Sequence, residues 1–131
     1  MKSAIDKLVR MVGQLVQSVE VQILFYGVEH HGDAGDVLIT FEKGQRFAFG
    51  CAGDGSVLVM QSRKEIGDAP GFTTTYRTIS NLGGELKNVA CKNNTICLQI
   101  SNSVLVLDNR DDDMEIALNG EPLPEEVYSR G

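Results

Sequence analysis

Short runs of alternating apolar and polar residues, separated by turns rich in Gly, Asn and Asp, limit most strongly how this chain can fold. Alternation with a period of two is typical of strands that bury one face. Such runs occupy 19–26, 36–42, 46–51, 56–61, 86–92, 95–101, 104–108 and 114–118, and 72–79 fits either a strand or a short irregular helix. Turns such as Lys43-Gly44-Gln45 and Asn93-Asn94 suit hairpins. The sequence therefore predicts an antiparallel β-meander, with a loop over 62–71.

An amphipathic helix of about four turns is predicted before the first strand. Apolar residues recur at helical spacing from Ile5 to Val19, and polar residues occupy the opposite side. Ser3 followed by Asp6 resembles a capping box. Gly13 costs this helix roughly 1 kcal/mol relative to Ala, so the alternative is a helix that ends near Gly13 and continues as a strand. Helix and meander together predict an α+β fold, and 131 residues fit a single domain.

Residues 12–60 and 82–118 share one order of turns and apolar positions, which predicts an internal repeat. The matches are Val12-Gly13 with Leu82-Gly83 at an offset of 70, Val37, Ile39 and Phe41 with Ile96, Leu98 and Ile100 at 59, and Leu58 and Met60 with Ile116 and Leu118 at 58. Two such β-rich halves would be related by a pseudo-twofold axis. The alternative is that any two meanders match this well once gaps are allowed. The tail, 119–131, follows the repeat, and its prolines are predicted to stop the sheet.

Negative charge is concentrated near the C-terminal end. The net charge is −6, and residues 108–131 account for all of it, with two Arg against eight Asp and Glu. Nucleic acids and anionic membranes attract Lys and Arg, so neither is an expected partner. A basic protein is the expected partner, since opposite charge accelerates association. The residues predicted to contact it are Asp111, Asp112, Asp113, Glu115, Glu125, Glu126, His30 and His31. The alternative is a solvated C-terminus that only aids solubility.

The sequence predicts a protein without catalytic residues, cofactor or metal. It contains no P-loop, dinucleotide-binding or His-Glu-x-x-His motif. His30 and His31 stand near Asp33 and Asp36, but adjacent side chains in an extended segment point apart, so a metal site is not expected. The Asp cluster at 111–113 lacks the ligand spacing of a calcium-binding EF-hand.

The three cysteines indicate a reducing compartment. They are odd in number and match no metal-binding or redox spacing. In a hairpin turning at Asn93-Asn94, Cys91 faces position 96, so Cys97 points to the other face of the sheet and no disulfide is expected. Because no apolar run is long enough to span a membrane or form a signal peptide, we expect a cytoplasmic protein.

In size, charge balance and lack of catalytic motifs, the whole chain resembles the immunity proteins of bacterial toxin systems. The glycine-containing repeat at Val12-Gly13 and Leu82-Gly83 and the ending Leu118-Asn119-Gly120 contribute to this resemblance. It implies neutralisation of one cognate basic toxin or effector through surface acids rather than a pocket.

Two other functions are compatible with the sequence. One is a small ligand-binding or metal-binding β-domain, or an enzyme, that uses the His30-His31 loop. The other is a secretion chaperone, which the chain resembles only in size and acidity. A free edge strand could pair two copies, so a monomer and a homodimer are both compatible with the sequence.

Overall fold

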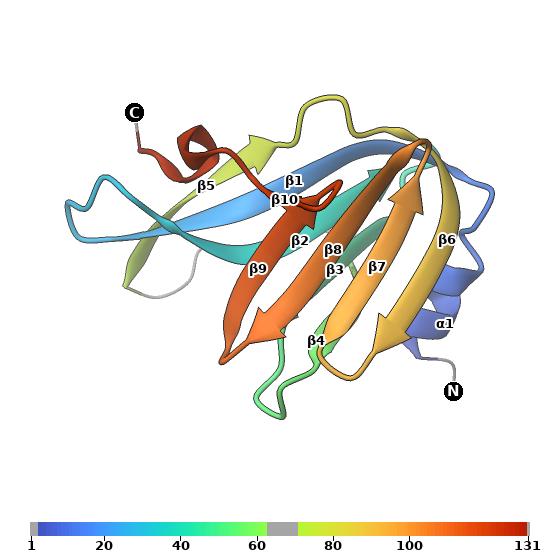
Figure 1. The fold of residues 1–131 in the computed structure, drawn as a ribbon, viewed down its shortest axis with the longest axis horizontal. Helices are drawn as coiled ribbons and strands as arrows, with labels where there is room; N and C mark the ends of the chain where they lie inside the picture. Colours follow the sequence, from blue (N-terminus) through green and yellow to red (C-terminus); the bar gives the residue numbers. More distant parts are fainter. Residues whose placement is uncertain (1–2, 63–70, 131) are drawn as a thin grey trace.

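The computed structural model describes residues 3–62 and 71–130 and consists mainly of antiparallel strands (Figure 1). Its elements are α1 (Ala4–Val9), β1 (Leu15–Tyr26), β2 (Asp33–Phe41), β3 (Arg46–Cys51), β4 (Val57–Ser62), β5 (Phe72–Thr78), β6 (Gly84–Lys92), β7 (Thr95–Ile100), β8 (Ser103–Arg110), β9 (Asp113–Leu118), β10 (Glu121–Pro122) and the 3₁₀ helix η1 (Glu125–Tyr128). Strands make up 61% of the described residues and helical segments 8%. The prediction of an α+β fold is therefore wrong, and the chain has a β-rich fold.

The predicted four-turn helix is reduced to the six residues of α1. Val9 and Leu15 are 48% and 49% exposed, so the apolar stripe does not continue as a buried helix face. Gly13 lies in the turn between α1 and β1, where it adopts a φ of +96°, and its N–H donates to the carbonyl oxygen of Leu86 at 2.8 Å. The chain then enters β1, whose many β-branched residues favour a strand.

The helix begins where the sequence predicts, after Ser3. The Ser3 hydroxyl oxygen accepts a hydrogen bond from the Asp6 N–H at 3.3 Å and so caps the first turn. Leu8 is fully buried, and α1 contacts β4 and β6. The helix thus contacts β4 in one half of the sheet and β6 in the other, and it lies beside β6 in Figure 1.

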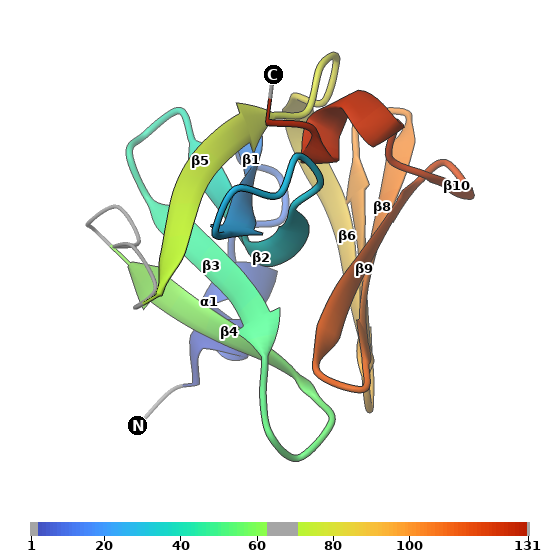
Figure 2. The same ribbon diagram turned by 90° about the vertical axis from the view of Figure 1, so that its left-hand side faces the viewer.

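The strands form one sheet that folds back on itself, so that its two halves face each other (Figure 2). The order is β10-β9-β8-β7-β6-β1-β2-β3-β4, and β5 pairs with β1. Leu15 and Val16 of β1 pair with Glu85 and Gly84 of β6, which joins the halves. Because β2 and β3 contact β9 and β4 contacts β8, the halves pack as two layers over a shared core.

Hydrogen bonding in the first half corresponds to that in the second. The N–H of Glu42 donates to the carbonyl oxygen of Leu15 at 2.9 Å, and the N–H of Ser101 donates to that of Glu85 at 2.8 Å. These two bonds are related by the offsets of 59 and 70 seen in the sequence. Leu15 and Glu85 also pair with each other where β1 meets β6. The join between the halves therefore lies where a pseudo-twofold axis would pass.

The correspondence changes by one residue in the last strand of each half. Val59 and Ile116 pack against the core, whereas Met60 is exposed. The inward positions thus match at an offset of 57, where the sequence predicts 58. The reason is that the paired core positions Phe49 and Val59 are ten residues apart, whereas their counterparts Leu107 and Ile116 are nine apart.

Two segments with uncertain sequence signals form strands. β5 pairs antiparallel with β1, so 72–79 is a strand rather than an irregular helix. The prediction that the prolines stop the sheet is wrong for Pro122, which pairs with Ala117. β10 is an edge strand, where a missing N–H donor is tolerated. Most of the predicted loop, 63–70, lies outside the residues that the structure describes.

The β6–β7 hairpin has the predicted register. Cys91 pairs with Ile96, and Cys97 pairs with Ala90. The cysteines Cys51, Cys91 and Cys97 are all free thiols.

Within 3–62 and 71–130, no helix has the length and apolar composition of a membrane-spanning helix.

Candidate functional site

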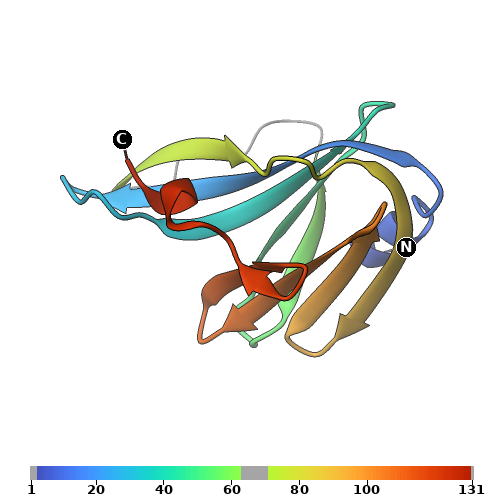
Figure 3. The same cartoon turned by 45° about the horizontal axis from the view of Figure 1, so that its top comes forward.

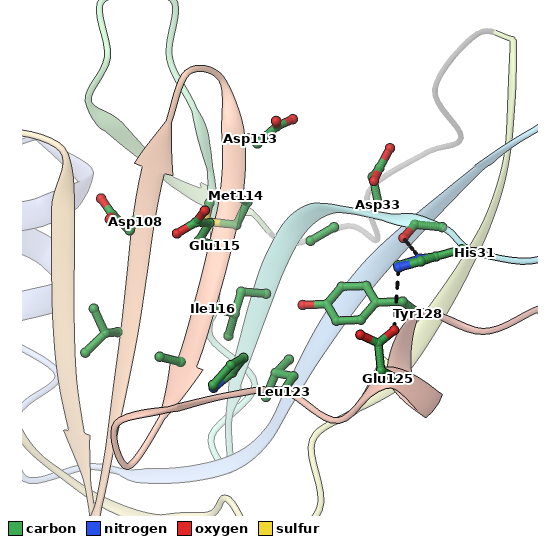
Figure 4. A pocket seen from close by; sticks show the side chains of 15 residues that line it. His31, Asp33, Asp108, Asp113, Met114, Glu115, Ile116, Leu123, Glu125 and Tyr128 are labelled. Carbon is green, nitrogen blue, oxygen red and sulfur yellow. Dashed lines mark hydrogen bonds and ion pairs between the residues drawn. The ribbon is translucent and has the colours of Figure 1, made fainter.

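A groove of about 560 Å³ borders β9 where the two layers of the sheet approach each other (Figure 4). Its lining residues are His31, Gly32, Asp33, Ala34, Val106, Asp108, Asp113, Met114, Glu115, Ile116, Ala117, Pro122, Leu123, Glu125 and Tyr128. They come from the start of β2 and the two residues before it, from the adjoining strands β8, β9 and β10, and from the C-terminal segment, residues 123–130. Segments far apart in the sequence therefore build one site.

The C-terminal segment forms one wall of the groove. It lies against the loop that connects β1 and β2 (Figure 3). The N–H of Gly32 donates to the carbonyl oxygen of Tyr128 at 2.7 Å, and the N–H of Arg130 donates to that of His30 at 2.9 Å. These backbone bonds fix residues 125–130 beside the start of β2.

The side chain of Arg130 strengthens this attachment. Its Nε and Nη2 donate to the carbonyl oxygens of Glu29 and Gly27, each at 2.9 Å. Its guanidinium carbon lies 4.5 Å from the centre of the Phe25 ring, within the range of a cation–π interaction. One arginine thus connects the chain end to both the loop and the core.

The groove has an apolar base and an acidic rim. Met114, Ile116 and Leu123 are each less than 8% exposed. The carboxylates that line the groove are Asp33, Asp108, Asp113, Glu115 and Glu125, and no Lys or Arg is among its described lining residues. Such a site attracts cationic groups and also offers apolar surface to bury.

His31 lies between the rim and the C-terminal segment (Figure 4). Its Nε2 is 3.7 Å from Oε2 of Glu125, but the two side chains are 62% and 91% exposed. The pair is ionic only when the imidazole is protonated, and at such exposure it adds little stability. The imidazole also lies 5.7 Å from the ring of Tyr128. Burial, with the Glu125 carboxylate, raises the pKa of Tyr128 above its ordinary value of 10.0.

The groove brings together half of the residues predicted to bind a partner. Within it lie His31, Asp113, Glu115 and Glu125. His30 and Glu126 border a neighbouring depression that also includes His31 and Glu125. Asp111 and Asp112 form the tip of the β8–β9 hairpin, beside Asp54 and Asn109 in a separate depression. The structure therefore divides the predicted set into a groove and a more distant hairpin tip.

Several lining residues were not predicted from the sequence. Asp108 belongs to the acidic C-terminal stretch and Asp33 to the His-rich loop, so their charge was visible but their proximity was not. Leu123 and Tyr128 carry no signal, because single apolar or aromatic residues are common in any chain. Their role depends on how the C-terminal segment folds back.

The His-rich loop does not contribute a recognisable metal-ligand set. His31 lines both the groove and the neighbouring depression, whereas, of these two, His30 lines only the depression. Among residues 3–62 and 71–130, no three His, Cys, Asp or Glu side chains are placed together as candidate metal ligands.

Asp36 lies on β2, three residues after the groove residue Asp33, and should make the free energy of unfolding depend on pH. Its Oδ1 lies 2.6 Å from the position that a Cβ at Gly50 would occupy. Burial raises the pKa of Asp36 above its ordinary value of 3.8. Between these two pKa values the unfolded chain binds fewer protons, so the free energy of unfolding falls as pH rises through this range and then stays low. We expect Asp36→Asn to remove that fall, as measured by urea denaturation between pH 3 and 7.

Asp33→Asn is the matched control, because it removes one negative charge from an exposed position of the same strand. Identical pH profiles for Asp36→Asn and Asp33→Asn would contradict the assignment to Asp36.

Comparison with protein-family models, curated protein sequences and solved structures returned no significant match.

Proposed function

We propose that this chain is a protein-binding module that binds and neutralises a basic partner through the acidic groove, in the manner of the immunity proteins it resembles. The observation that carries the proposal is the gathering of five carboxylates from four elements on one groove. Surface carboxylates within one Debye length act together on an approaching cation.

The composition of the groove suits a protein rather than a simple ion. Interfaces combine a desolvated apolar centre with a polar rim. Met114, Ile116 and Leu123 would supply the centre, and the carboxylates around them would steer and orient the partner. The proposed interface thus differs from the sequence expectation of surface acids without a pocket.

The contacts of the C-terminal segment support a preformed site. Hydrogen bonds from Gly32 and Arg130 hold this segment in place before any partner arrives. Preorganisation lowers the entropic cost of binding. The alternative of a secretion chaperone is less well supported. That resemblance implies the pattern helix, strands, helix, strands, helix, whereas the described residues form one short α-helix and one 3₁₀ helix.

The proposal predicts that removing negative charge from the groove weakens binding, whereas removing it elsewhere does not. The groove variant is Asp113→Asn, Glu115→Gln and Glu125→Gln; the control variant is Asp111→Asn, Asp112→Asn and Glu126→Gln. Both remove three charges, and Asn tolerates the positive φ of residues 111 and 112. Partners are captured from lysate of the native cells at low salt, identified by mass spectrometry, purified and titrated by calorimetry.

We expect a basic partner whose Kd rises at least tenfold with the groove variant, mainly through slower association, and less than threefold with the control. The effect should shrink at about 0.5 M salt, where screening is short-ranged. Equal effects of the two variants would exclude the groove as the interface. Failure of the folded protein to retain any basic partner, or a captured partner whose own activity is unchanged in the complex, would contradict neutralisation.

A further inference from the structure

Strand β9 has an unpaired margin inside the groove. β8 pairs with β9 along its whole length, but β10 pairs only with Ala117 and Leu118 on the other side. Among the described strands, none pairs with that side of β9 over residues 113–116. This margin borders the groove, and its residues contribute to the lining.

The register of the hairpin shows which backbone groups face the groove. In an antiparallel pair, alternate residues direct their N–H and C=O groups to the partner strand. The N–H of Asn119 donates to Val104 of β8 at 2.9 Å, so Ala117, Glu115 and Asp113 also direct these groups to β8. Met114 and Ile116 therefore direct theirs away from β8, toward the groove. Because Pro122 has no N–H, its pairing with Ala117 directs the N–H of the next residue, Leu123, at the carbonyl oxygen of Ile116. Met114 and Ile116 therefore offer two donors, and Met114 one acceptor, to an added strand.

The side chains of β9 determine what such a strand would carry. Met114 and Ile116 are buried on the inner face, whereas Asp113 and Glu115 are exposed on the outer face. Side chains of an added strand would alternate in the same way. Those beside Met114 and Ile116 would meet apolar surface, and those beside Asp113 and Glu115 would meet carboxylates, with Asp108 close by on β8.

We infer that the partner inserts an extended segment, in which Lys or Arg alternates with apolar residues, as an additional strand on the free margin of β9. This inference rests on the proposed function and adds the form of the recognised segment. Charge complementarity selects the occupant, because a cationic side chain at every second position would face the carboxylates. Main-chain hydrogen bonds to Met114 and Ile116 would then provide affinity in the way known for strand addition.

The test uses the synthetic peptide acetyl-Lys-Val-Lys-Val-Lys-Val-amide, titrated into the full chain by calorimetry at low salt. Met114→Pro removes one donor on the groove side and no bond to β8, so an edge proline should be tolerated. Met114→Ala is the matched control, since it loses the same side chain but keeps the N–H. We expect Met114→Pro to bind the peptide about fivefold more weakly than Met114→Ala, as expected for one lost hydrogen bond.

Two measurements keep the test decisive if Met114→Pro does not fold. First, the peptide should slow hydrogen exchange of the Met114 and Ile116 amides in the unmodified chain. Second, the same peptide with every second backbone nitrogen methylated keeps its charge and side chains and should bind at least tenfold more weakly. A peptide with Glu in place of Lys should not bind.

The outcomes separate this inference from the proposed function. Equal binding of the methylated and unmethylated peptides, or no binding of the Lys-Val peptide, overturns strand addition. If the groove carboxylates still control binding of the natural partner, the proposed function stands without it. If they do not, the proposed function fails independently.

Discussion

Asn109→Asp is expected to lower the free energy of unfolding by about 3–5 kcal/mol at neutral pH, because it places an unpaired charge in a buried site. Asn109 is 3% exposed. Its Nδ2 donates to the carbonyl oxygens of Ala52 at 3.1 Å and Ser56 at 2.7 Å, and its Oδ1 accepts from the N–H of Asp112 at 3.0 Å. One side chain thus connects the loop between β3 and β4 to the turn between β8 and β9.

A carboxylate at this position would direct an oxygen at two carbonyl oxygens, close to the acidic hairpin tip. Asn109→Ala removes the same donors without adding charge, so it should cost less, about 1–3 kcal/mol. Urea denaturation at pH 7 and pH 4 distinguishes the two, since protonation of the new carboxyl would restore a donor and reduce the cost at low pH. Asn93→Asp, at an exposed turn position, is the control for the chemical change. A cost for Asn109→Asp no larger than that for Asn109→Ala at pH 7 would show that Asn109 does not join the hairpins in this way.

Gly32→Ala is the second substitution for which we expect a large effect. Gly32 is buried, and a Cβ at this position would collide with Cγ2 of Ile23 and approach Cε1 of Phe25 to 2.9 Å and the carbonyl oxygen of Leu24 to 3.0 Å. Because core side chains and backbone surround this position, overpacking should cost about 1–3 kcal/mol. Gly32 also donates to Tyr128, so its displacement should loosen the C-terminal wall of the groove.

Thermal and urea denaturation measure the cost, and hydrogen exchange of the Gly32 amide reports on the wall. Gly53→Ala is the matched control, because its Cβ would have no neighbour within 4 Å and its φ is not positive. We expect near-wild-type stability for Gly53→Ala. Unchanged stability and unchanged protection in Gly32→Ala would mean that this part of the wall yields readily.

The strands were predictable because alternation depends on near neighbours, and the helix was mispredicted because of one local irregularity. The register between β1 and β2 shifts between Val16 and Ser18. This bulge places both Val16 and Val19 in the core, three positions apart, which is also the spacing of a helix face. Periodicity alone does not distinguish the two, and Gly13 was the residue that signalled an early end of the helix, which the structure places at Val9.

The groove was only partly predictable, because charge is visible in a sequence and proximity is not. Asp113 and Glu115 were predicted to act together. They do line the same groove, because both lie on the exposed face of β9. Glu125 and His31 meet only because Arg130 and Tyr128 attach the C-terminal segment to the loop before β2. No short-range pattern encodes a contact between residues about a hundred positions apart.

That long-range attachment also determines when during synthesis the groove can exist. Arg130 contacts Gly27 and Glu29, which leave the ribosome about a hundred residues earlier. A nascent chain can pair β1, β2, β3 and β4 and still lack one wall of the groove. A chain that has not yet emerged as far as Arg130 therefore lacks the C-terminal wall of the groove and, under the proposed function, would not bind a partner there.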